Sequence, residues 1–175
     1  PLRVCTRTGA NGWTYTEKSN GLNVSGTVHW KGVTRKIEGH KYMANIDISM
    51  GYMRRETYWN WASFSGLVDV GSGKEKVGLN LASGVNETSY TENCFWLGQK
   101  MIHLNGACFS FDRENPKKKW IIKTQDNSID LQFVPEQNRS EKINLLFLAS
   151  NFQQMIGRFY GVVRDEEKEI KINGL

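Results

Sequence analysis

The segment VGLNLASGVNETSYTENCFWLGQKMIHL, residues 77–104, reads as three consecutive β-strands joined by turns. Its first part alternates apolar residues with other residues at period two, and its last part folds back around Gly98 as a hairpin. Three polar side chains, Asn80, Glu92 and Asn93, stand in segments whose other residues suit a core. This segment therefore predicts a sheet with polar side chains in its interior.

The period of two continues along the chain, with glycine, asparagine and aspartate between the segments. No convincing long helix interrupts it, and residues 1–12 and 135–142 look like loops. The pattern predicts an all-β, antiparallel fold of about ten to twelve strands, arranged as a barrel, a strongly curved sheet or a sandwich. The main predicted strands are residues 24–30, 42–49, 56–64, 76–81, 92–97, 100–104, 120–124, 129–133, 143–149 and 153–163.

Composition narrows the class of protein. A length of 175 residues predicts a single domain, 1–175, with a core large enough to fold without disulfides. No apolar run reaches the length of a membrane span. Three cysteines without a C-x-x-C pair predict reduced thiols, and hence a cytoplasmic location, rather than a disulfide framework or a zinc site.

The net charge of +5 does not by itself indicate nucleic-acid binding. The dense basic run, residues 117–119, follows an Asn-Pro turn signal, which favours a solvated loop over a phosphate-binding patch. The sequence has no recognition helix, no Cys/His finger, no phosphate-binding loop and no dinucleotide fingerprint. We therefore expect no nucleic-acid partner, no metal and no cofactor.

Seven polar residues lie in or beside apolar or aromatic strands: Asp47, Glu56, Asn60, Asn80, Glu92, Asn93 and His103. Alternation can place any of them on a solvated outer face. A buried carboxylate, in contrast, shifts its pKa unless it is paired or hydrogen-bonded, which makes Glu92 and Asp47 the candidate general acids. Glu92 and Asn93 are adjacent, so within a strand their side chains would point to opposite faces.

Aromatic residues are concentrated in residues 56–64, where both faces of the predicted strand carry rings. Trp59 and Trp61 share one face. They serve either core packing or the wall of a pocket, because small-molecule pockets are mostly apolar with a few convergent polar groups.

Six segments in order resemble the family called domain of unknown function 2804. They are residues 12–18 (GWTYTEK), 56–62 (ETYWNWA), 77–81 (VGLNL), 91–94 (TENC), 129–135 (IDLQFVP) and 154–161 (QMIGRFYG). The resemblance implies a lipocalin-like β-barrel architecture with two halves, of which this chain would be the C-terminal half. It attaches no activity, although carotenoid hydratases and tocopherol cyclases are distantly similar in architecture.

Three functions follow as hypotheses. The first is a binding domain for a small apolar ligand, with a mouth formed by Trp59, Trp61, Asn80, Glu92 and Asn93, which docking of the N-terminal half would complete. The second is an enzyme that hydrates, isomerises or cyclises an unsaturated apolar substrate by acid catalysis. The third is a protein-interaction domain, which an exposed apolar patch would favour.

Overall fold

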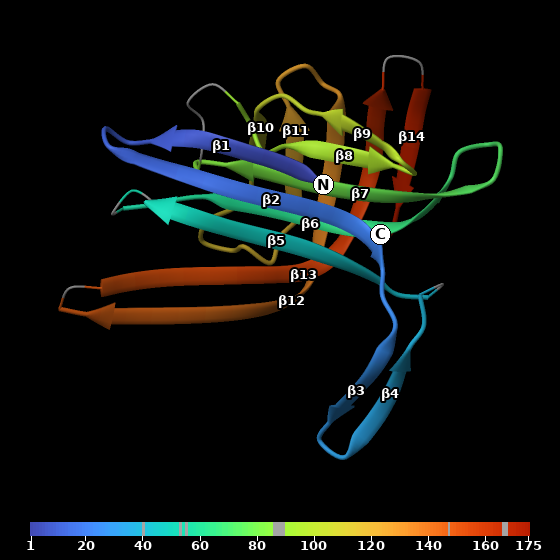
Figure 1. Ribbon diagram of the computed structural model, residues 1–175, viewed down its shortest axis with the longest axis horizontal. Coiled ribbons are helices and arrows are strands. Elements are labelled where there is room, and N and C mark those ends of the chain that lie inside the picture. The colour runs from blue at the N-terminus through green and yellow to red at the C-terminus, as the bar shows by residue number, and fades with distance from the viewer. Residues whose placement is uncertain (40, 53, 55, 86–89, 147, 166–167) are drawn as a thin grey trace. The chain divides into compact units, whose positions relative to one another are not determined.

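The computed structural model describes residues 1–175 except 40, 53, 55, 86–89, 147 and 166–167. These described residues form antiparallel strands and no helix, which confirms the all-β prediction (Figure 1). The strands are β1 (Leu2–Thr8), β2 (Gly12–Asn23), β3 (Gly26–Trp30), β4 (Val33–Ile37), β5 (Met43–Tyr52), β6 (Asn60–Asp69), β7 (Lys74–Ser83), β8 (Cys94–Leu97), β9 (Lys100–His103), β10 (Ala107–Ser110), β11 (Trp120–Thr124), β12 (Ile129–Leu145), β13 (Leu148–Asp165) and β14 (Lys168–Asn173).

Pairing among the described residues gives four sheets and no closed barrel. Their strand orders are β1-β2-β5, β3-β4, β6-β7-β8-β9 and β10-β11-β12-β13-β14. The three strands predicted in residues 77–104 are β7, β8 and β9, which pair in sequence as expected.

Three strand predictions need correction. The segment predicted as a loop at residues 1–12 contains β1, which pairs with β2 over its whole length. The predicted loop at residues 135–142 lies inside β12, where a register shift between Pro135 and Gln137 lets the ladder continue past proline. Conversely, β6 begins only at Asn60, and not at residue 56.

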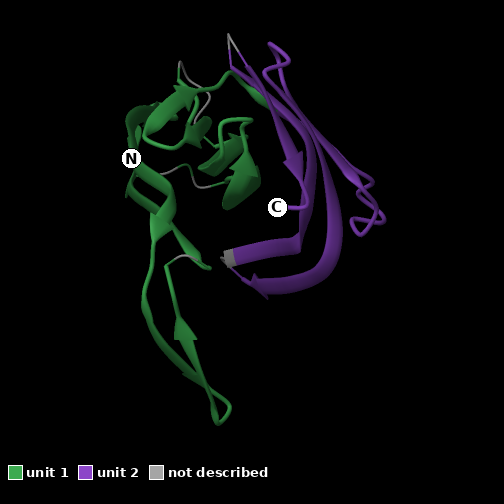
Figure 2. Cartoon of the chain, turned by 90° about the vertical axis from the view of Figure 1, so that its right-hand side faces the viewer, with its two compact units in different colours: residues 1–107 green, residues 108–175 purple. Residues whose placement is uncertain are grey.

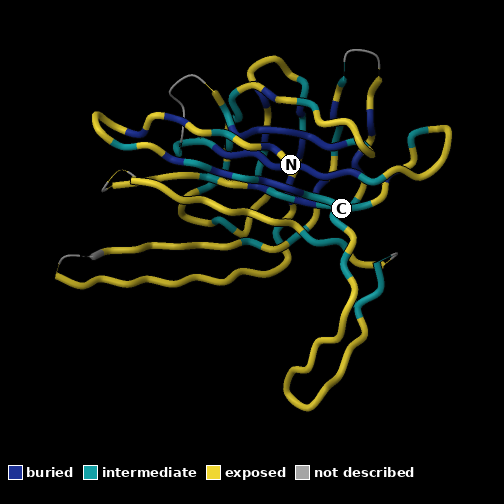
Figure 3. Tube along the Cα trace, viewed as in Figure 1, coloured by how far each residue is buried: buried dark blue, intermediate teal, exposed yellow. Residues whose placement is uncertain are grey.

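The chain divides into two compact units, Pro1–Ala107 and Cys108–Leu175 (Figure 2). Unit 2 is the five-stranded sheet, whose buried face includes Ile129, Leu131 and Phe133. Beyond the register shift, β12 and β13 continue as an exposed two-stranded arm (Figure 3). The single-domain assignment stays a prediction.

Unit 1 contains residues 77–104, and β7 of its four-stranded sheet is buried on both faces. Val77, Leu79 and Leu81 form the apolar face, as alternation predicts. Gly78 and Asn80 lie on the opposite face, and that face meets β2 of the three-stranded sheet. A strand with both faces covered has no solvated side on which to place polar residues.

Asn20 of β2 fastens the two sheets together. Its Nδ2 donates to the carbonyl oxygen of Leu79 at 2.6 Å and to Ser63 Oγ at 2.8 Å. Gly78 makes this approach possible, because a Cβ there would lie 2.6 Å from Asn20 Cβ. The close backbone contact therefore requires glycine at this position.

The three-stranded sheet has its polar face inward. Thr14, Thr16 and Lys18 of β2 are buried, although alternation alone would place such residues on the solvent side. The opposite face carries large apolar side chains that are all at least 42% exposed: Trp13, Ile46, Ile48, Met50 and Tyr52. An edge-to-face contact between Trp13 and Tyr52 joins the rings of neighbouring strands on this outer face.

We predict that Gly78→Ala lowers the free energy of unfolding by about 1–3 kcal/mol, because the added methyl group displaces Asn20. Urea denaturation measures this loss. Gly39→Ala is the matched control: its nearest atom is the Val24 carbonyl oxygen at 3.4 Å, and we expect a change within about 0.5 kcal/mol. Equal effects of the two substitutions would contradict the close packing of β2 on β7.

Candidate functional site

Lys18 is the centre of the candidate site. Its side chain is only 5% exposed, and Nζ lies 2.5 Å from Asp47 Oδ1 and 3.6 Å from Glu92 Oε1. The strand register produces the first contact, since Lys18 of β2 is directly opposite Asp47 of β5. The second contact comes from the side of the four-stranded sheet, because Glu92 lies in the irregular segment that leads into β8. The cluster thus joins both layers of unit 1.

The two carboxylates differ in their surroundings. The Asp47 side chain is 42% exposed and reaches solvent, whereas that of Glu92 is 6% exposed. Burying an ammonium or a carboxylate costs several kcal/mol of hydration free energy, on the order of the gain from a well-placed opposite charge. The ion pair between Lys18 and Glu92 therefore offsets part of the cost of burying these two groups inside unit 1.

Cys94 lies beside this cluster, packed with Leu2 and Trp96. Burial, and secondarily the Glu92 carboxylate, raise the pKa of the Cys94 thiol well above its ordinary value. The thiol therefore stays protonated at neutral pH and is no nucleophile. The folded state keeps the Cys94 thiol protonated, whereas the unfolded state ionises it above a pKa of about 8.5. The free energy of unfolding is therefore unaffected by this thiol below that pH and decreases as the pH rises above it.

Asn80 and Asn93, both predicted to line the mouth, have amides occupied by internal hydrogen bonds. Asn80 donates to the Glu92 carbonyl oxygen at 2.8 Å and accepts from Trp61 Nε1 at 2.9 Å. Asn93 accepts from the Ala82 amide at 2.6 Å and donates to a carbonyl oxygen of the segment after β9 at 3.0 Å. The two amides thus hold β6, β7 and the segment before β8 in place.

The expectation that Glu92 and Asn93 divide between inside and outside is wrong. Both are buried. The alternation rule does not apply to them, because β8 begins at Cys94 and these two residues lie in the irregular segment before it. Irregular backbone can turn consecutive side chains to the same side of the chain.

The other predicted residues lie further out. Trp59 and Trp61 are both about half exposed, and the Trp61 indole nitrogen points to Asn80. Glu56 and His103 are exposed, and His103 Nε2 lies 3.0 Å from the carbonyl oxygen of Thr91. The structure therefore brings Asp47 and Glu92 together around Lys18, and Trp61 to the edge of the same interior through Asn80.

Threonines line the inward face next to Lys18. Thr8 and Thr14 share a hydrogen bond of 2.7 Å, and Thr16 lies 3.0 Å from Ser49. Thr6 is directly opposite Thr14 in the β1–β2 ladder and is also buried. Its hydroxyl oxygen is the one buried side-chain polar atom among the described residues that has no hydrogen-bond partner.

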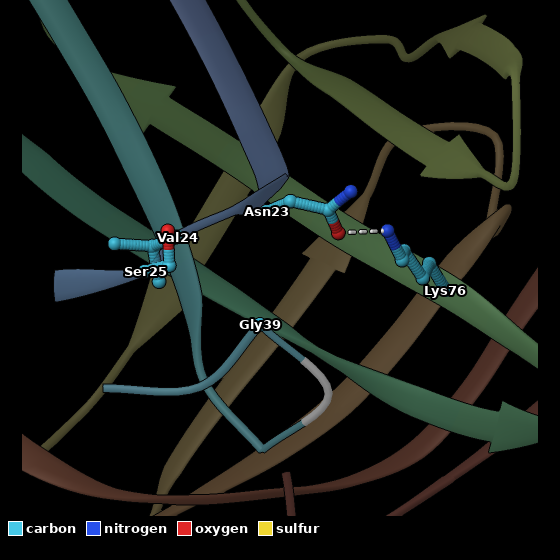
Figure 4. Close-up of a pocket in the computed structure, with 5 residues that line it drawn as sticks. All are labelled: Asn23, Val24, Ser25, Gly39 and Lys76. Carbon is cyan, nitrogen blue, oxygen red and sulfur yellow. Dashed lines mark hydrogen bonds between the residues drawn. The ribbon is translucent and has the colours of Figure 1, made fainter. Parts of the chain in front are cut away.

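A separate pocket of 470 Å³ opens where the β3–β4 hairpin leaves the three-stranded sheet (Figure 4). It is lined by Asn23, Val24, Ser25, Gly39 and Lys76, and Lys76 donates to Asn23. It shares no residue with the Lys18 cluster. In the part of the chain that the structure describes, no group of three or more histidine, cysteine or acidic residues is arranged to hold a metal ion.

Lys18 is the residue that sequence reasoning missed. Residues 12–18 alternate aromatic and polar side chains, which directs attention to Trp13 and Tyr15 and away from Thr14, Thr16 and Lys18. The available signal was the matching alternation of Asn45, Asp47 and Ser49 in the neighbouring strand. Two strands with complementary polar faces, one with a lysine and one with an aspartate, can pair with those faces inward.

A known protein family matches this chain over its whole length. The model of the family described as Domain of unknown function (DUF2804) matches residues 1–175. The chain belongs to the DUF2804 family. No curated protein matches this DUF2804 chain, and no solved structure does. Within the described residues, no helix combines the length and apolarity needed to cross a membrane.

We predict that Lys18→Met destabilises the protein by about 3–5 kcal/mol, because it removes the Lys18 ammonium from a buried ion pair. Adding Glu92→Gln recovers part of this loss. Thermal and urea unfolding measure both effects. Lys123→Met, which breaks a half-exposed pair with Asp130, is the control and costs at most about 1 kcal/mol. Equal losses at Lys18 and Lys123 would contradict the buried cluster.

A second prediction concerns thiol reactivity. Cys5 and Cys108 are exposed and Cys94 is buried, so iodoacetamide at pH 8 modifies the first two in the native protein and Cys94 only after unfolding. Mass spectrometry of peptides from the labelled protein gives the three rates. Modification of native Cys94 as fast as Cys5 would show that the interior beside Glu92 is open to solvent.

Proposed function

We propose that unit 1 binds a small ligand with an apolar body and at least one hydrogen-bonding group, between its three-stranded and its four-stranded sheet. The unpartnered hydroxyl of Thr6 supports this proposal more directly than any other observation. A buried polar group without a partner costs about 1–3 kcal/mol, and a ligand that hydrogen-bonds to it removes that cost. The buried threonines beside it and the ionised cluster at Lys18 supply further polar contacts.

Trp59 and Trp61 would contact the apolar body of the ligand. Each indole is half exposed, and Trp61 is fixed by its hydrogen bond to Asn80. This arrangement corresponds to the usual composition of small-molecule sites, which have apolar walls and a few oriented polar groups. We infer that Glu92, Asn80 and Asn93 form the buried end of the site. We also infer that the architecture is lipocalin-like, as the family resemblance implies.

The test uses farnesol, retinol and oleic acid as probes. We expect at least one of them to raise the melting temperature and to change tryptophan fluorescence, because ligand binding to the native state stabilises it. Thr6→Val abolishes or weakens this shift and leaves the ligand-free protein as stable as before or slightly more stable, since the unpaired hydroxyl is gone. Thr27→Val, on an exposed hairpin, is the control that leaves binding intact.

The outcome that contradicts the proposal is equally specific. If Thr6→Val lowers the stability of the ligand-free protein by more than about 1 kcal/mol, its hydroxyl has a structural partner and the proposed ligand contact is wrong. If no probe shifts the melting temperature or the fluorescence, the apolar ligand class is wrong.

The acid-catalysis hypothesis has less support. A general acid must be available to the substrate, whereas both Asp47 and Glu92 are engaged in ion pairs with Lys18. Turnover of an unsaturated probe that is lost in Glu92→Gln and kept in Asp47→Asn would restore this hypothesis over simple binding.

A protein-interaction role is the second candidate, and the apolar outer face of the β1-β2-β5 sheet favours it. Its occupant would be the N-terminal half of the longer protein that the family resemblance implies. In that longer protein, Ile48→Asp would lower the melting temperature, whereas in residues 1–175 alone it would change little because Ile48 is 44% exposed. Equal small effects in both would exclude this occupant.

A further inference from the structure

The β3–β4 hairpin projects from the three-stranded sheet as an exposed two-stranded element (Figures 1 and 3). Its two strands are in register from Gly26 opposite Ile37 to Trp30 opposite Val33. Lys31 and Gly32 form the two-residue turn with φ angles of 47° and 75°, the backbone that a tight type I′ hairpin requires. The tip therefore has a defined conformation.

The two faces of this hairpin differ. One face carries four apolar side chains, Val28, Trp30, Val33 and Ile37, together with Arg35, and Trp30 at the tip is 68% exposed. The other face carries threonine, histidine and lysine side chains. An isolated two-stranded hairpin is at best marginally stable in water, and this one leaves its apolar face in solvent. An apolar medium at the tip would stabilise it.

The charge of the hairpin indicates the chemical nature of the apolar medium that would stabilise its tip. Residues 25–37 contain three cations, Lys31, Arg35 and Lys36, and no carboxylate. Lys31 Nζ lies 4.6 Å from the centre of the Trp30 ring, so an ammonium group and an indole share the tip. Tryptophan concentrates at the interface between lipid and water, and lysine and arginine near an anionic bilayer contribute about 1 kcal/mol each.

We propose that the β3–β4 hairpin docks this protein on the surface of an anionic lipid bilayer, with Trp30 and Val33 in the interface and Lys31, Arg35 and Lys36 against the headgroups. The aliphatic residues on the Trp30 face distinguish a bilayer from a nucleic acid, because phosphates and bases gain little from valine and isoleucine. Docking is peripheral, since the hairpin is too short to span the hydrocarbon core.

The experiment is co-sedimentation of the whole 175-residue chain with vesicles of phosphatidylcholine, with and without phosphatidylserine. We expect binding to the vesicles that contain phosphatidylserine and a decrease in binding as salt is added. Lys31→Glu with Lys36→Glu reduces the partition coefficient by more than about tenfold, and Trp30→Ala also reduces it. Because these side chains are exposed, the variants keep the melting temperature of the parent protein.

The control has the same change of charge elsewhere. Lys117→Glu with Lys119→Glu alters two exposed lysines of the basic run in unit 2, and we expect it to keep most of the binding. Equal losses in the control and the hairpin variant would overturn the proposal, as would equal binding to vesicles with and without phosphatidylserine or binding to neither. Hairpin-dependent binding of a single-stranded oligonucleotide without vesicle binding would identify a nucleic-acid surface instead and also overturn it.

Discussion

The burial of one ammonium group governs the organisation of unit 1. Lys18 points between the three-stranded and the four-stranded sheet, where an unpaired charge would be prohibitive, and it has a carboxylate close to it on each side. Asp47 satisfies this only in the register that places β5 opposite β2, and Glu92 only if the segment before β8 lies across the other layer. Asn80 then holds that segment by donating to the Glu92 carbonyl oxygen, and Asn93 holds it by accepting from the Ala82 amide of β7. The buried polar residues of the segment 77–104 therefore complete a cluster that begins with Lys18 on β2.

The same constraint reverses the usual polarity of the three-stranded sheet. With threonines, Lys18 and Asp47 inward, the aromatic and aliphatic residues of β2 and β5 turn outward. The interior gains hydroxyl groups, one of which, among the described residues, has no partner, and the exterior gains an apolar face. The inward polar face of this sheet supports the proposed ligand binding, and its outward apolar face supports the proposed association with a protein. The β3–β4 hairpin, which extends from the same sheet, adds a basic and aromatic surface of its own.

The sequence predicted the all-β class, the antiparallel pairing of β7, β8 and β9 and the apolar face of Val77, Leu79 and Leu81, because these depend on local periodicity and turn chemistry. The described residues form fourteen strands and not the expected ten to twelve. It also selected Asp47, Glu92 and Asn80 as residues of interest. It could not show which face of β2 or β5 is inward, because alternation is symmetric and the usual rule, apolar inside, fails here. Lys18 was missed for that reason. The burial of both Glu92 and Asn93 depends on irregular backbone that period-two reasoning does not describe.

The NMR exchange rate of the lysine side-chain ammonium protons with water at neutral pH tests the buried cluster most directly. Burial of Lys18 between two carboxylates predicts one strongly protected lysine ammonium resonance, while the exposed lysines exchange too fast to be observed. Loss of this resonance in Lys18→Met assigns it, and Asp47→Asn weakens its protection. Rapid exchange of every lysine ammonium group in the folded protein would contradict the buried cluster, and with it the inverted sheet.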